Sequence, residues 1–176
     1  MTTRLAVPLT EAILLALWIG AALLFTLVVA PAAFAVLPTR SLAGALVGRV
    51  LPVVFYAGMI IGATIVVLDV IGRSATWGRT GAGAVAAISC AVAQLVVGAR
   101  IDGLRESIGG PLDALAPDDP RRVAFGRLHA VSVGWLGVAM LAAALALILT
   151  MRALPVAIDG SGGVTPPADP PAKSQR

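Results

Sequence analysis

Four long apolar runs, separated by short polar segments, organise the chain. They cover approximately residues 9–30, 42–72, 81–101 and 120–151. A helix needs about 20 mostly apolar residues to cross a hydrocarbon layer roughly 30 Å thick, and each run meets that length. The pattern predicts an all-α fold: an integral membrane four-helix bundle with its membrane domain in residues 1–157.

Prolines and a serine predict where the first two helices end and begin. Pro31 lacks a backbone donor, so we expect it to kink or end the first helix. Residues 31–38, bounded by two prolines, are then expected at the membrane surface. Ser41 is the predicted N-cap of the second helix. The apolar core at residues 12–30 exceeds the roughly 7–15 residues of a signal peptide, which favours a retained span over a cleaved leader.

The second half of the chain carries further end signals. The third helix is expected to leave the membrane as helix through residues 99–110, which contain charges of both signs. Asp119 followed by Pro120 is typical of a helix start. Residues 158–176 are rich in proline, glycine and polar side chains, so we predict a disordered tail.

Composition supports lipid as the main solvent of this chain. Hydrophobic residues make up 59% and charged residues 12%, against roughly 45–50% and about 25% in soluble domains. The net charge of +4 comes from basic residues spread over loops and tail. Because they form no basic face, we expect the lipid bilayer and not nucleic acid as partner.

The arginines near the span ends predict an orientation. The end with the termini has Arg4, Arg73, Arg79 and Arg152; the other end has Arg40, Arg49, Arg100, Arg105, Arg121, Arg122 and Arg127. Basic residues are enriched in cytoplasmic loops. The larger set therefore favours termini outside, in a multi-pass protein that we expect in a bacterial plasma membrane.

Small residues at helical spacing predict the faces where helices pack, because membrane helices associate by close approach. The second and fourth spans each carry such a stripe: Gly44, Gly48, Gly58 and Gly62, and Gly126, Ala130, Gly134 and Gly137. We expect these stripes to pack within one protomer, with homodimer packing as the alternative.

Two groups of polar residues are candidate sites, because polar side chains inside a membrane are costly. Glu11 and Asp69 form a candidate acidic pair near the terminal end. Pairing with neighbouring arginines or contact with interfacial water is one interpretation, and a joint acidic site is the other.

The second group is a candidate polar pocket at the opposite end, formed by Arg49, Gln94, His129 and Ser132. His129 is the only histidine of the chain. It could serve a structural hydrogen bond, or it could bind a ligand or a proton at its unperturbed pKa of about 6.5.

Enzyme motifs are missing from the sequence: there is no H-E-x-x-H, nucleophile elbow or phosphate loop. One histidine and one cysteine, Cys90, are too few for a bis-histidine haem or a C-x-x-C site. We therefore expect no catalytic residues, no protein-supplied metal site and no cofactor. A membrane-bound redox or metal enzyme is the least favoured hypothesis.

Two other functions remain. The first is a non-enzymatic helical bundle that acts by packing or by binding a partner, either a second copy in a homo-oligomer or another membrane protein. The alternative is a small transporter or ligand-binding protein with a polar pocket around His129.

Four stretches together resemble the transmembrane-protein-205-like family of small four-helix membrane proteins. They are APAAFAVLP from residue 30, AGALVGRVLP from 43, ARIDGLRESIGG from 99 and FGRLHAVS from 125. The resemblance implies an integral membrane protein of unknown function, without an established activity or cofactor. Leu128, His129 and Ser132 match the family's L-H-x-x-S pattern, but Leu136 stands where an asparagine often follows.

Overall fold

The computed structural model describes residues 2–71 and 76–159, and every element in these ranges is helical. Four helical spans are long and apolar enough to cross a membrane: Ala6–Val36, Arg40–Ile71, Trp77–Ile108 and Pro120–Leu154. The predicted fold class is confirmed, and the protein is a multi-pass membrane protein. The predicted tail lies outside the described residues, apart from its first two, which end the last helix.

Two of the four spans are built from several helical segments. The first span consists of α1 (Thr2–Leu24), the π-helical η1 (Phe25–Val29) and α2 (Ala30–Val36). The second is α3 (Arg40–Ile71), and the fourth is α6 (Pro120–Asp159). The third consists of α4 (Trp77–Ala91), the π-helical η2 (Val92–Gly98) and α5 (Ala99–Ile108), and a short 3₁₀ turn, η3 (Leu112–Ala114), precedes α6.

The sequence predicted that Pro31 kinks or ends the first helix, and the helix does not end there. The chain stays helical through Pro31 to Val36, so residues 31–36 extend the span and do not form a separate surface segment. The π-helical segment η1 lies directly before the proline, and the amide of Ala30 donates to the carbonyl of Phe25, five residues earlier. The local change of bonding register accommodates the donor that Pro31 lacks.

The N-cap of α3 is Thr39, not Ser41. Thr39 Oγ1 accepts a hydrogen bond from the amide of Leu42 at 3.2 Å. The amide of Ser41 donates instead to Asp113 Oδ2 at 2.8 Å, so a carboxylate from η3 satisfies a second free donor at this helix start.

Two further predicted end signals are confirmed, at the end of α5 and at the start of α6. α5 runs to Ile108 and ends at Gly109, whose φ of +65° is the left-handed conformation that glycine adopts without strain. Asp119 Oδ1 accepts a hydrogen bond from the backbone amide of Arg121 at 2.8 Å, and Pro120 occupies the first helical position. The side-chain and backbone hydrogen bonds from Arg121 hold the pKa of Asp119 below its usual value.

Other predicted bounds differ: α1 begins at Thr2 and not near residue 9, α4 begins at Trp77 and not near residue 81, and α6 continues to Asp159, past residue 151. The predicted end of the second span at residue 72 lies outside the described residues.

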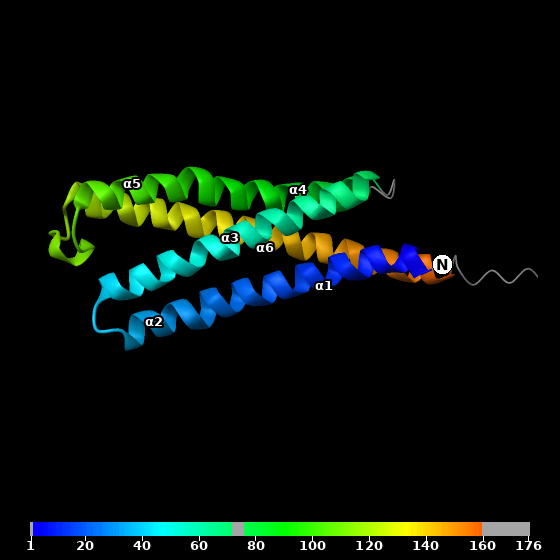
Figure 1. Ribbon diagram of the computed structural model, residues 1–176, viewed down its shortest axis with the longest axis horizontal. Helices are drawn as coiled ribbons and strands as arrows, with labels where there is room; N and C mark the ends of the chain where they lie inside the picture. Colours follow the sequence, from blue (N-terminus) through cyan, green and yellow to red (C-terminus); the bar gives the residue numbers. More distant parts are fainter. Residues whose placement is uncertain (1, 72–75, 160–176) are drawn as a thin grey trace, which may run out of the picture.

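The helices diverge at the end that carries the 1–2 and 3–4 loops (Figure 1). At the opposite end, here called the tight end, Arg79 of α4 lies 3.8 Å from Glu11 of α1. α4 packs against both α3 and α6, and α1 packs against α6 and α3. From there α2 and the start of α3 diverge from α5 and the start of α6, towards the end that carries the 1–2 and 3–4 loops. This divergence leaves space between the helices at the loop end.

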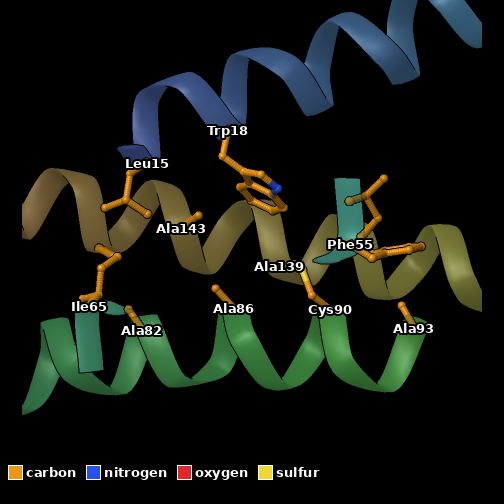
Figure 2. Close-up of a cluster of buried hydrophobic side chains, with 12 residues drawn as sticks. Leu15, Trp18, Phe55, Ile65, Ala82, Ala86, Cys90, Ala93, Ala139 and Ala143 are labelled. Carbon is orange, nitrogen blue, oxygen red and sulfur yellow. The ribbon is translucent and has the colours of Figure 1, made fainter. Parts of the chain in front are cut away.

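Alanines and a few large side chains make up the core. In Figure 2, Ala139 and Ala143 of α6 lie between Leu15 and Trp18 of α1 and Ala86 and Cys90 of α4. The small side chains let the helices approach closely, which is how membrane helices gain packing contacts in a solvent as apolar as themselves. Trp18 also donates its ring N–H to the carbonyl of Val54 at 2.8 Å, which ties α1 to α3.

Candidate functional site

A cavity of about 130 Å³ lies where the helices diverge. Its walls come from α2, α3, η2, α5 and α6. The lining includes Phe34, Val47, Leu51 and Phe55, which are apolar, and Gln94, Asp102, Arg105, His129 and Ser132, which are polar. A small number of polar groups in a mostly apolar wall is typical of ligand sites.

Three of the four predicted pocket residues line this cavity. His129 and Ser132 come from α6 and Gln94 from η2. Ser132 is buried, while His129 and Gln94 are half-buried. The ring of His129 lies parallel to that of Phe125, with centroids 6.4 Å apart and an interplanar angle of 1°. Helical spacing on α6 therefore turns this polar face inward, as the sequence suggested.

Arg49 is not part of the cavity. It is exposed, and the side of α3 that carries it faces away from the bundle interior. The arginine that lines the cavity is Arg105, which the sequence analysis did not select. Gln94, Gly98, Ile101 and Arg105 all line the cavity and follow helical spacing, so a stripe drawn from Gln94 would have found it.

Arg105 is held over the cavity by contacts with α3 and α6. One of its N–H groups donates to the carbonyl of Gly44 at 3.3 Å. Its guanidinium carbon lies 5.3 Å from the centre of the Phe125 ring, a cation–π distance. A Cβ on Gly48 would lie 2.8 Å from Nη1 of Arg105, so the missing side chain at Gly48 gives the guanidinium its space.

A second cavity of about 390 Å³ adjoins the first at the loop end. Phe34, Gly44, Arg105 and Phe125 line both cavities. The second cavity also has Arg40, Arg122 and Asp113 in its wall. In the part of the chain that the structure describes, none of the three arginines lies within 4 Å of a carboxylate oxygen.

The predicted acidic residues meet at the other end of the bundle, and an arginine lies between them. Asp69 is fully buried and accepts hydrogen bonds from Nε of Arg79 at 3.1 Å and from a second guanidinium nitrogen. Thr80 Oγ1 donates to the same carboxylate at 2.8 Å. Glu11 Oε2 lies 3.8 Å from Nη1 of Arg79. This geometry is the ion pairing that one interpretation of the sequence expected.

Glu11 is held less completely than Asp69. It is 1% exposed, and within residues 2–71 and 76–159 neither of its carboxylate oxygens has a hydrogen-bond partner. Breaking a buried ion pair leaves an uncompensated charge, so each member of such a group depends on the others. Glu11, Asp69 and Arg79 connect α1, α3 and α4, and this cluster fixes the tight end of the bundle.

The glycines of α3 behave largely as predicted. A Cβ on Gly62 would lie 2.7 Å from the carbonyl oxygen of Gly83, and one on Gly58 would lie 2.5 Å from the Trp18 ring. Gly48 makes room for Arg105, and Gly44 faces open cavity space with nothing within 4 Å. The stripe therefore packs at one end and lines the cavity at the other.

The stripe on α6 does not pack within the protomer, so this prediction is wrong. Gly126, Ala130, Gly134 and Gly137 are exposed, and a Cβ on each of the three glycines would meet nothing within 4 Å. The buried face of α6 contains Leu136, Ala139, Ala143 and Ala146 instead. Alanine adds only one methyl group to the helix surface, so this face also permits close packing.

Comparison with known proteins gives a family and no function. A family model described as a domain of unknown function (DUF4149) matches residues 13–109, more than half of the 176-residue chain. The matched region holds Gln94 and Arg105 but ends before α6, which carries His129 and Ser132. No curated protein and no solved structure matched the chain.

Proposed function

The chain belongs to the DUF4149 family, and from that premise we propose that it is a non-enzymatic membrane protein that binds a small amphiphilic ligand between its diverging helices. The ligand site is the cavity around His129, Arg105, Gln94 and Ser132. This proposal favours the ligand-binding hypothesis over a bundle that acts by packing alone.

One observation carries the proposal: hydrogen-bonding groups from three helical segments converge on one hollow with apolar walls. Gln94 comes from η2, Arg105 from α5, and His129 and Ser132 from α6. Unfilled space beside polar groups is costly in a membrane protein unless a molecule or water occupies it. A ligand with a polar head and an apolar body matches both parts of the wall.

The experiment fills the cavity without disturbing the packing. Gly44 lines both cavities and has nothing within 4 Å of its Cβ position, so Gly44→Leu places a side chain into the space. Gly20→Leu is the matched control, because Gly20 is exposed on α1 and also has no neighbour within 4 Å. Each protein is purified in native nanodiscs, and bound molecules are identified by mass spectrometry.

We expect a stoichiometric bound molecule in the wild type and in Gly20→Leu, and its loss in Gly44→Leu with unchanged thermal stability. The proposal fails if the wild type carries no bound molecule, or if Gly44→Leu retains the same one. Chemical conversion of the bound molecule by the purified protein would refute the non-enzymatic part, and saturable flux in vesicles would favour a transporter.

A second candidate function is assembly with a partner through α6. The exposed stripe of Gly126, Ala130, Gly134 and Gly137 favours it, because small residues let a second membrane helix approach closely. The partner is a second copy in a homo-oligomer or another membrane protein. Crosslinking from Gly134→Cys, compared with Gly20→Cys, tests this function, and equal crosslinking of the two variants contradicts it.

Two narrower assignments belong to the same proposal. The four sequence stretches favour the transmembrane-protein-205-like family within small four-helix membrane proteins. We place the protein in a bacterial plasma membrane, and the distribution of arginines favours an orientation with the cavity end at the cytoplasmic side. Fluorescent fusions to the first loop and to a terminus, read out on the two sides of the membrane, test the orientation.

A further inference from the structure

We propose that the two adjoining cavities bind a phosphate ester that carries an apolar chain, with its anionic group held by Arg40, Arg105 and Arg122. The inference rests on the proposed function and names the ligand class of that site. It depends on a different observation, however: the positive charge in the wall of the second cavity, and not the hollow around His129.

The three arginines come from three helices and lie at one level of the membrane. Arg40 is the first residue of α3, Arg105 lies in the last turn of α5, and Arg122 lies in the first turn of α6. These helix ends coincide with the ends of the candidate spans. Lipid phosphates lie in the headgroup layer that borders the hydrocarbon core, which is this level.

Most N–H groups of these three guanidinium groups are available to bind a ligand. A guanidinium carries five N–H groups. Among the described residues, the hydrogen bonds assigned to these arginines are one from Arg105 to the carbonyl of Gly44 and one from Arg122 to the carbonyl of Leu115, at 3.3 and 2.9 Å. Guanidinium groups bind phosphate oxygens in pairs, so converging arginines with free donors form a phosphate site.

The acids in the walls do not cancel this charge. Asp113 lines the second cavity, and its Oδ2 is already engaged by the amide of Ser41 at 2.8 Å. Asp102 lines the first cavity and forms no ion pair with Arg105 within 4 Å. Three arginines against these two acids leave an excess of positive charge, which favours an anionic ligand.

The first cavity supplies the place for the rest of the ligand. Phe34, Val47, Leu51 and Phe55 form an apolar wall next to Arg105 and suit an acyl chain. Gln94, His129 and Ser132 line the same cavity and can hydrogen-bond the ester or hydroxyl oxygens of a backbone that joins chain to phosphate. An anionic phospholipid has an anionic phosphate, hydrogen-bonding ester oxygens and acyl chains, and the two cavities offer a partner for each of these parts.

The test compares lipid binding by the full chain in detergent, using native mass spectrometry. The probes are phosphatidylglycerol, which is anionic, phosphatidylcholine, which is zwitterionic, and inorganic phosphate. We expect one phosphatidylglycerol to remain bound where phosphatidylcholine is lost. Because a hydrogen bond to a charged group is among the stronger protein contacts, Arg105→Gln and Arg40→Gln should each weaken phosphatidylglycerol binding about tenfold.

Arg100→Gln is the matched control, since Arg100 is exposed on α5 and lines neither cavity. Arg40→Gln keeps the test informative if Arg105→Gln misfolds, because among the described residues no hydrogen bond is assigned to the Arg40 side chain. Thermal stability of each variant is measured beside binding. We expect Arg100→Gln to bind phosphatidylglycerol as the wild type does.

Equal retention of the two lipids would overturn the inference, as would wild-type binding in folded Arg105→Gln and Arg40→Gln. If inorganic phosphate binds as tightly and displaces the lipid, the ligand is a soluble phosphate and the acyl chain has no role. If Gly44→Leu removes a bound molecule that the arginine variants keep, the cavity binds an uncharged ligand. The proposed function then stands while this inference fails.

Discussion

Replacing Gly62 by alanine should separate α3 from α4 at their closest approach. The new Cβ would lie 2.7 Å from the carbonyl oxygen of Gly83 and 2.8 Å from the amide nitrogen of Ala87. Both neighbours are backbone atoms, so neither can rotate away as a flexible side chain would. The helices have to move apart by several tenths of an ångström, and the packing along the whole α3–α4 contact changes with them.

The expected cost follows from overpacking. Forcing an extra methyl group into a well-packed interior costs about 1–3 kcal/mol. Alanine is a better helix former than glycine by up to about 1 kcal/mol, which partly offsets that cost. Gly20→Ala gains the same helix preference without the clash, because Gly20 has nothing within 4 Å of its Cβ position. The difference between the two variants therefore isolates the packing cost of about 1–3 kcal/mol.

The measurement is reversible unfolding in mixed micelles, where rising denaturing detergent gives the free energy of unfolding. Gly20→Ala should match or exceed the wild type, and Gly62→Ala should fall below Gly20→Ala by the stated amount. Equal stability of the two variants would show that α3 and α4 do not meet at Gly62, and the arrangement of the tight end would be refuted.

Two further predictions concern helix ends at the loop side of the bundle. Gly109→Ala should lower the free energy of unfolding by about 1–2 kcal/mol relative to Gly110→Ala, because only Gly109 has a left-handed φ; the same micelle titration checks it, and equal stability contradicts it. Asp119→Ala should lower the melting temperature at neutral pH, because the pKa of Asp119 is depressed by its hydrogen bonds from Arg121. A carboxylate with a depressed pKa stabilises the fold above its ordinary pKa and loses that effect as the pH falls through the depressed value, so the gap between variant and wild type should close in acid. A gap that persists unchanged in acid would contradict this reasoning.

Some helix ends could be predicted from the sequence because they depend on local chemistry. Two ends depend only on residues that are neighbours in sequence: the cap at Asp119 and Pro120, and the helical extension up to Gly109. The sequence pattern alone was therefore enough to predict them. Ser41 was predicted as the N-cap in place of Thr39 because serine and threonine both cap helices and the two residues lie within one turn. Pro31 was mispredicted because a proline ends a helix only if the preceding turn cannot adjust, and η1 adjusts.

For the candidate site too, some residues could be predicted from the sequence and others could not. Gln94, His129 and Ser132 were found because polar groups deep in apolar runs are conspicuous. Arg49 was selected because it lies deeper in its apolar run than Arg105 does, but depth does not say which side of a helix faces the interior. The choice depends on the side of the helix that faces inward, and α3 turns Arg49 outward while α5 turns Arg105 over the cavity.

The sequence by itself determined that this protein has four membrane spans, where α5 ends and α6 begins, and which residues share a helix face. Tertiary structure alone decided which face of each helix meets a neighbour. The glycine stripes of α3 and α6 follow the same rule, yet one packs against α4 and lines the cavity while the other faces outward. The physical reason is that lipid is as apolar as the helix surfaces, so hydrophobicity does not fix the rotation of a helix about its axis. That rotation is fixed by the fit of all four helices together and by buried polar contacts such as the one between Asp69 and Arg79.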